Sequence, residues 1–242
     1  MKTKSIITLM LCALFGFSGM AQEKKTFTVN GVSFNMIYVQ GGTFQMGSND
    51  SGASYMEEPV HSVTLSDYYI GETEVTQELW EAVMGTTVEQ QRKKEEEYLG
   101  HDLDLYGVGS NYPMCYISWE DCQEFIKKLN RITGKNFRLP TEAQWEYAAR
   151  GGNKSLGYEY SGSNTIDEVA WYYRNACKVG SSSSDYGTHR VGTKLPNELG
   201  LYDMSGNVWE WCSDWYGSYS TSSQTNPTGP TTSSDRVLRG GG

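Results

Sequence analysis

The sequence predicts a loop-rich α+β fold in which short helices surround small antiparallel sheets and regular secondary structure is low. Three observations lead to this prediction. Aromatic residues make up 13% of the 242 residues and glycine occurs 27 times, so aromatic side chains can build a core while glycines form turns. Apolar and polar residues alternate over residues 26–46, as they do in half-buried strands. Three separate helix-start signals then follow along the chain.

Residues 1–21 are typical of an export signal. Lys2 and Lys4 precede an apolar run over residues 6–17, and small residues lie before a cleavage point after Ala21. The run is too short to span a bilayer comfortably, and no later stretch is long enough. We therefore expect a protein exported to the periplasm or the extracellular space, with no membrane span.

Charge and cysteine count narrow the classes of function. Removal of residues 1–21 changes the net charge from −9 to −11, because it takes away two lysines. This sign argues against nucleic acid as a partner. Four cysteines then remain, which permits two disulfides in any of three pairings; they are Cys115, Cys122, Cys177 and Cys212. The three histidines lack a metal-ligand spacing, so no zinc site is expected.

The first strands are expected within residues 26–46. Turn-forming pairs at Asn30–Gly31 and Gly41–Gly42 divide this segment into two or three antiparallel strands. Residues 60–70 alternate again and predict a further strand. His61 in that strand is expected to be a hydrogen-bonded structural residue and not a catalyst.

Three short helices are expected in the middle of the chain. Each has a polar residue that can cap its first turn and a glycine after its last turn. The expected N-caps are Thr76, Ser118 and Thr141, and the glycines that end the helices are Gly85, Gly134 and Gly151–Gly152. Residues 86–111 mix Lys, Arg and Glu, which predicts a solvated helix or a surface insertion.

Little regular structure is expected in the remaining third of the chain. Patterns fade over residues 152–194, and residues 218–234 are rich in Ser, Thr, Pro and Gly, which indicates a loop. Residues 236–239 look like the beginning of a strand. The length of the chain fits one large domain or two small ones.

Residues 195–217 stand out for their chemistry. Turn formers are frequent there and predict a tightly folded loop and not a helix. Carboxylates alternate with three tryptophans, namely Trp209, Trp211 and Trp215. Oxygen donors spaced through such a loop suit a hard cation such as calcium. The alternative is that the tryptophans pack in the core and the acids are solvated. The spacing alone favours this alternative, because it is not an EF-hand pattern.

Together these segments resemble the formylglycine-generating enzyme family, also called the sulfatase-modifying factors. The resemblance rests on stretches in the family's order: GGTFQMGS (41–48), the strand Pro59–Val63, EVTQELW (74–80), SWEDCQEF (118–125), FRLPTEAQWEYAARGG (137–152), GLYDMSGNVWEW (200–211) and RVLRGG (236–241). It implies that residues 22–242 form a single irregular domain of formylglycine-generating-enzyme type, related to C-type lectins.

The resemblance also implies a structural calcium ion. The family's calcium loop falls on Asp203, Gly206, Val208 and Glu210. By this analogy the two acids give side-chain oxygens, and the other two residues give backbone carbonyls. A second family site uses an Asn near the position of Trp171, and it is not carried over because an indole cannot bind calcium.

Family enzymes oxidise a cysteine of an exported sulfatase to formylglycine, with oxygen and a copper ion held by two cysteines. That Cys-x-x-x-x-Cys pair follows an Arg-Gly-Gly-Ser segment, which corresponds to residues 239–242 with Gly242 in place of the serine. None of the chain's cysteines lies at these positions, so no catalytic and no cofactor-binding residue is assigned. We expect a domain that is incomplete at its C-terminus, with copper only if a missing segment supplies the pair.

Three functions are compatible with the resemblance. The first is an exported oxidase whose partner is an exported sulfatase, and the chain as given lacks the copper-binding pair. The second is a non-catalytic lectin-like binding or structural module, whose ligand is another protein or a glycan. The third, a sulfoxide synthase, ranks last because it needs an iron-binding histidine set that three isolated histidines cannot supply.

Overall fold

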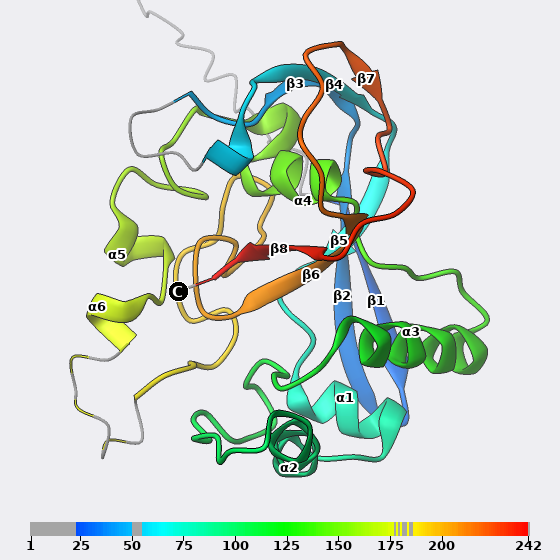
Figure 1. The fold of residues 1–242 in the computed structure, drawn as a ribbon, viewed down its shortest axis with the longest axis vertical. Helices are drawn as coiled ribbons and strands as arrows, with labels where there is room; N and C mark the ends of the chain where they lie inside the picture. The colour runs from blue at the N-terminus through cyan, green and yellow to red at the C-terminus, as the bar shows by residue number, and fades with distance from the viewer. Residues whose placement is uncertain are drawn as a thin grey trace, which may run out of the picture.

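The described residues form three small sheets with short helices beside them (Figure 1). The computed structural model describes residues 23–49, 55–176, 178, 180, 183 and 186–241. The expected export signal and Cys177 lie outside these residues. The predicted α+β class, with short helices and small sheets, is confirmed.

The first sheet has the strand order β1–β2–β5 and is antiparallel throughout. Its strands are β1 Lys24–Val29, β2 Val32–Val39 and β5 Tyr68–Gly71. Asn30 and Gly31 connect β1 to β2 with φ angles of 50° and 89°, the positive values that a tight two-residue hairpin needs. The hairpin predicted at this pair is therefore confirmed.

The second sheet has the order β3–β4–β7 and departs from the prediction. Its strands are β3 Gly42–Met46, β4 His61–Leu65 and β7 Gln224–Thr225. β7 pairs with β4 in parallel, so the sheets are not all antiparallel. The single strand predicted over residues 60–70 is wrong, because the chain turns at Ser66–Asp67 and continues as β5 in the other sheet. Hydrogen bonds from distant residues hold this turn, since Ser66 N donates to Asn226 Oδ1 at 2.9 Å and Gly41 N donates to Asp67 Oδ1 at 2.8 Å.

The three predicted helices are present, and each begins at its predicted N-cap. They are α1 Gln77–Met84, α3 Trp119–Thr133 and α4 Glu142–Ala149. The mixed-charge segment also contains a helix, α2 Val88–Leu99, which begins with a capping box of Thr87 and Gln90. Glycines end α1 and α3 as predicted, whereas Arg150 caps the end of α4, one residue before Gly151.

The described part of residues 152–194 has little regular structure, as predicted. They contain short single-turn pieces, which are η2 Gly152–Lys154, α5 Ile166–Val169 and α6 Tyr173–Ala176, and a similar piece, η1 Tyr55–Glu57, lies earlier in the chain. Among the described residues, no helix has both the length and the apolar character needed to cross a membrane.

The loop predicted over residues 195–217 is correct only for its first part. The second part is strand β6, Trp209–Trp215, which pairs antiparallel with β8, Arg236–Gly240. The two strands lie side by side across the middle of the view in Figure 1. The strand was not predicted because its partner lies in a distant part of the chain, so the local turn formers dominated the pattern.

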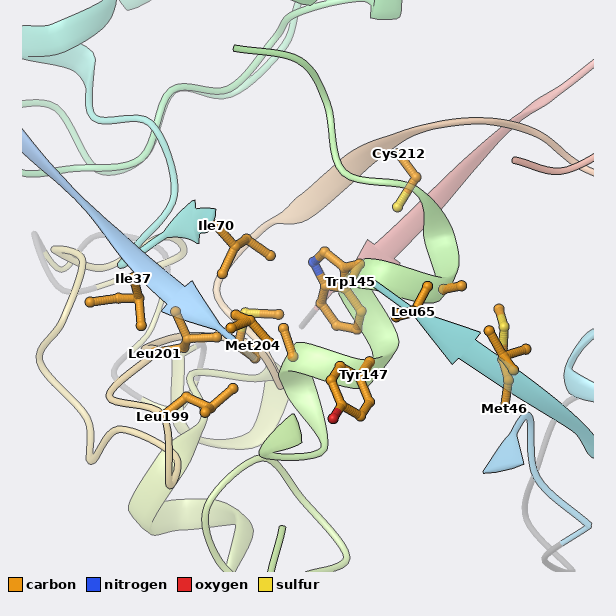
Figure 2. Close-up of a cluster of buried hydrophobic side chains, with 14 of the residues drawn as sticks. Ile37, Met46, Leu65, Ile70, Trp145, Tyr147, Leu199, Leu201, Met204 and Cys212 are labelled. Carbon is orange, nitrogen blue, oxygen red and sulfur yellow. The ribbon is translucent and has the colours of Figure 1, made fainter. Parts of the chain in front are cut away.

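Buried apolar side chains form two clusters. The larger one gathers around Trp145 and Tyr147 of α4 (Figure 2). Leu199, Leu201 and Met204 belong to it, although they lie in the irregular segment before β6. Each fully buried leucine stabilises the fold by about 1.5–3 kcal/mol. The irregular segment is therefore part of the core, and the core holds the polar residues between these side chains in place.

The smaller cluster joins α1 and α3 to β1. At its centre the rings of Trp80 and Phe125 stack with their centroids 5.2 Å apart and their planes at 1°. Cys122, Phe125 and Leu129 are buried in α3, at spacings of three and four residues that bring them to one face of a helix.

Candidate metal centre

A buried asparagine shapes the segment before β6. Asn197 is only 5% exposed, and its side-chain Nδ2 donates to Ala148 O at 2.8 Å. Its Oδ1 accepts from the backbone N–H groups of Leu199 and Leu201 at 3.0 and 3.2 Å. One side chain thus satisfies backbone groups on both α4 and the loop, which fixes the loop against the helix.

Asp203, the first predicted calcium ligand, lies in the turn that follows. It is 2% exposed and has a φ angle of 60°, a left-handed conformation that Asp tolerates better than most residues. Its Oδ2 accepts from Gly192 N at 2.7 Å. Gly206 closes the turn against Trp171, since a Cβ there would lie 2.2 Å from Trp171 O. The side chain of Asp203 is therefore held in a fixed direction by a turn that requires glycine.

Val208 and Glu210, the other two predicted ligands, lie at the start of β6. Val208 O accepts from Gly241 N at 3.1 Å. A Cβ on Gly240 would lie 2.9 Å from Val208 O and 3.6 Å from Glu210 Oε1. Both oxygens therefore flank Gly240, and the pairing of β6 with β8 brings them to one place.

Glu74 is a member of this group that the sequence analysis did not single out. Its Oε1 accepts from Asn207 Nδ2 at 2.9 Å. The second oxygen, Oε2, and Oδ1 of Asp203 are both buried and have no donor among the described residues. The two carboxyl groups lie near enough to each other that each shifts the pKa of the other. The signal that could have identified Glu74 from the sequence is its place as the first residue of the EVTQELW stretch, which resembles the family.

We call Glu74, Asp203 and Glu210 the unpaired acid cluster. Burial raises the pKa of Glu74 well above its ordinary value, and the charges of the other two add to this. Burial also raises the pKa of Asp203, whereas the hydrogen bond from the Gly192 N–H lowers it. Burial raises the pKa of Glu210 to about 7, while the indole of Trp145 lowers it. The Trp145 N–H does not reach hydrogen-bond geometry with any described group.

The unpaired acid cluster can hold either protons or a cation. Calcium takes six to eight oxygens from carboxylates and backbone carbonyls, and two buried carboxyl oxygens without donors fit that demand. Within the described ranges, no three His, Cys, Asp or Glu side chains are arranged as a metal-ligand set. A cation at this place would therefore depend on carbonyl oxygens as well, as the predicted set of two acids and two carbonyls does.

A different arrangement occupies the region of the family's second calcium site. Trp171 stacks on His189 with the ring centroids 3.7 Å apart and the planes at 4°. The ammonium of Lys194 lies 4.0 Å from the Trp171 ring centroid, and Trp171 Nε1 donates to Thr193 Oγ1 at 2.8 Å. A protein-borne cation and two rings thus fill the space around Trp171.

The described cysteines do not fit a copper site. Cys115, Cys122 and Cys212 form no disulfide with one another or with any other described cysteine. Burial raises the pKa of Cys115 and of Cys122 to about 12, and that of Cys212 well above its usual range. Copper(I) binds thiolates, and these thiols keep their protons at neutral pH.

A second set of buried acids lies at the start of α4, and we call it the paired acid cluster. It consists of Glu142 and Glu146 with Arg239, Arg150 and Tyr219. Arg239 Nη2 donates to Glu142 Oε1 at 2.5 Å, to Glu146 Oε2 at 3.2 Å and to Tyr219 Oη at 2.6 Å. Arg150 Nε donates to Glu146 Oε1 at 2.9 Å. Two guanidinium groups thus balance two carboxylates.

Comparison with known proteins gives the family. The sulfatase-modifying factor enzyme 1-like domain family matches residues 21–242. The chaperone protein LppX of Paenibacillus barcinonensis is 36% identical, over 99% of this chain and 88% of its own. A formylglycine-generating enzyme of Streptomyces coelicolor is 32% identical, over 85% of this chain and 77% of its own.

Solved structures agree with this assignment. Treponema denticola variable protein 1 has a TM-score of 0.72 and 34% identity, over 90% of this chain and 87% of its own. PvdO from Pseudomonas aeruginosa has a TM-score of 0.64 and 25% identity, over 90% of this chain and 85% of its own. The motifs, the fold and these relatives lead to one conclusion: the chain belongs to the sulfatase-modifying factor family, which includes the formylglycine-generating enzymes.

Proposed function

We propose that the described part of this chain is a calcium-stabilised binding module on the sulfatase-modifying factor scaffold. The observation that carries this proposal is the state of the described thiols. Each of the three is buried with a raised pKa, so they support a packing role and not copper chemistry. Names within the family allow both functions, because one relative is named a chaperone and others are named formylglycine-generating enzymes.

Calcium is proposed to bind at the unpaired acid cluster. Asp203 and Glu210 would give side-chain oxygens, Gly206 and Val208 would give carbonyls, and Glu74 would add a fifth oxygen. The support for this assignment is the pair of buried carboxyl oxygens that lack donors. The role of the ion would be structural, because it would join the turn before β6 to the EVTQELW segment.

The binding role is tested with a peptide that contains Cys-x-Pro-x-Arg. The full chain is incubated with this peptide, oxygen and copper, and the product is analysed by mass spectrometry for conversion of cysteine to formylglycine. The formylglycine-generating enzyme of Streptomyces coelicolor is the positive control. We expect no conversion by this chain, and turnover of the peptide would overturn the proposal.

The second candidate is the oxidase of the family. It is favoured by the 32% identity to the Streptomyces coelicolor enzyme. In that case the copper-binding thiolates would come from residues other than the three described cysteines, and the partner would be an exported sulfatase. The same peptide assay decides between the two candidates.

We also propose that the protein acts after export, in the periplasm or outside the cell. The support is the sequence of residues 1–21 alone. Mass determination of the protein recovered from its native host would show a mature N-terminus at Gln22. Recovery with Met1 intact would contradict export by cleavage.

A further inference from the structure

A cleft of about 570 Å³ lies on the side of α4 that carries the paired acid cluster. The start of α4, the end of β6 and residues 217–230 enclose it. In Figure 1 the last of these segments runs from β6 to β7 beside β4 and then returns to β8. Its volume is within the range of about 300–1,000 Å³ that is typical of small-molecule sites. The cleft is separate from the unpaired acid cluster, none of whose residues lines it.

The floor of the cleft is fixed before any ligand arrives. Tyr219 donates its hydroxyl hydrogen to Glu142 Oε1 at 2.9 Å, and Arg239 donates to both of these groups. His61 packs against the Tyr219 ring with the centroids 5.0 Å apart. Side chains that are held by several bonds lose little further freedom on binding, which favours affinity.

Three acceptor atoms on residues that line the cleft have no partner among the described residues. Nδ1 of His61 lies 3.0 Å from Pro59 O, which can only accept, so Nδ1 carries the hydrogen and Nε2 is left as an acceptor. Both hydrogen bonds to the carboxyl group of Asp214 go to Oδ2, which leaves Oδ1. Both bonds to Glu142 go to Oε1, which leaves Oε2. His61 and Asp214 are each only 4% exposed, so the surrounding fold holds their side chains in defined positions.

The outer wall of the cleft is formed by the polar segment 217–230, and ordering this segment costs conformational entropy. Ser218, Gln224 and Thr228 contribute side chains that both donate and accept hydrogen bonds. Asn226 anchors the segment, since its N–H donates to Thr64 O at 2.9 Å and its Oδ1 accepts from Ser66 N at 2.9 Å. Fixing the backbone costs about 1–2 kcal/mol per residue, so a loop this polar is held by specific bonds and not by burial.

The chemistry of the lining selects one class of ligand. Acceptor atoms in the floor call for hydroxyl or N–H donors on the ligand. Arg239 pairs with Glu142, and the charges of Arg138 and Arg236 act on Asp214, so the carboxylates that line the cleft do not call for a further cation, and the remaining acceptors repel an anion. The rings of Trp215 and Tyr219 give an apolar surface beside these polar groups. We propose that this cleft binds a neutral saccharide, an inference that rests on the proposed binding role and gives it a site.

The test is isothermal titration of the full chain with neutral trisaccharides of glucose, galactose, mannose and N-acetylglucosamine. Spermidine and glucose 6-phosphate are the cationic and anionic probes. We expect at least one neutral trisaccharide to bind and neither charged probe to do so. Binding of spermidine or glucose 6-phosphate alone, or of none of the probes, would overturn the proposal.

Two variants place the binding in the cleft. His61→Phe removes the Nε2 acceptor and keeps a ring against Tyr219, and Thr228→Trp fills the cleft from an exposed wall position. Each is expected to weaken binding by about tenfold or more. The matched controls are His101→Phe, at an exposed histidine, and Ser222→Trp, on the same segment outside the lining. Unchanged binding in Thr228→Trp, which leaves the buried residues intact, would show that the saccharide binds elsewhere and would refute the inference.

This experiment separates the failure of the cleft from the failure of the binding role. If the chain oxidises the peptide with copper, the binding role is wrong as the whole account, whatever the titration gives. If it neither oxidises the peptide nor binds a saccharide, the cleft inference alone is wrong.

Discussion

Two groups of buried carboxylates lie in this molecule, and they differ in what balances them. The paired acid cluster has two arginines, and each carboxylate in it accepts a guanidinium bond. Among the described residues, the unpaired acid cluster forms no bond with an arginine or a lysine, and two of its oxygens have no donor. The first is complete within the fold, whereas the second needs a proton or an ion from solution. A buried carboxylate therefore indicates a ligand site only when no donor or cation within the protein already balances it.

The largest effect is expected from Arg239→Met in the paired acid cluster. Removal of the guanidinium leaves Glu142 and Glu146 buried without their shared cation, and loss of one partner of a buried ion pair costs about 3–5 kcal/mol. Urea unfolding measures the loss. Arg150→Met is the control, because this arginine also bonds Glu146 but its side chain is 47% exposed. It should cost about 1 kcal/mol or less, and equal losses in the two variants would contradict the comparison.

Calcium is expected to stabilise the protein through the unpaired acid cluster. An ion at 100 times its Kd that binds only the folded state adds about 2.7 kcal/mol. Thermal unfolding after treatment with EDTA, with and without added calcium, measures this increment. Asp203→Asn should reduce it strongly, whereas Asp235→Asn, at an exposed aspartate, should leave it unchanged. The calcium proposal is wrong if saturating calcium does not move the unfolding temperature.

Without calcium, the free energy of unfolding is expected to fall as the pH rises from about 4.5 to about 7. The folded pKa of Glu210 is raised to about 7 from 4.5, so the folded state binds the proton more tightly than the unfolded state does. Its contribution is therefore present below pH 4.5 and is lost as the pH passes through about 7, a loss on the order of 3 kcal/mol. Urea unfolding in EDTA at several pH values measures it. Glu210→Gln should flatten the profile, and Glu78→Gln, at an exposed glutamate, should not.

The smallest effects are expected when one glutamate in each cluster is replaced by glutamine. Glu74→Gln gives the orphaned oxygen pair a donor, because the new amide can keep the bond from Asn207 and donate to Asp203. Without calcium it should stabilise the protein by about 1 kcal/mol. Glu142→Gln removes the charge that Arg239 needs and should destabilise by about 1 kcal/mol. The same sign in both variants, measured by urea unfolding in EDTA, would mean that the two clusters do not differ as described.

Local signals in the sequence predicted the helices and the hairpin. A cap such as Ser118 and a turn such as Asn30–Gly31 act on residues close in the chain, so their effect can be read without the rest of the fold. Strand β6 and the break at Ser66–Asp67 could not be predicted in this way, because β8 and Asn226 decide them from far away.

The candidate metal centre was predictable in part. Asp203 and Glu210 were named from the resemblance to the family, and the charge of Asp203 raises the pKa of Glu210. Their role as calcium ligands stays a prediction. Glu74 was missed because it lies on another part of the chain, and only the fold brings it to Asn207. The partners of Glu142 were missed for the same reason.

The parallel pairing of β7 with β4 has a consequence for the order in which the chain folds. Val63 pairs with Gln224, so the second sheet cannot close until the chain has been synthesised beyond residue 225. The pairing of β1 with β2 joins residues that are close in the chain, so this hairpin can form early. Topologies with many such distant contacts fold slowly and expose apolar strands while they wait. A nascent chain of this protein would therefore benefit from a holding factor during synthesis.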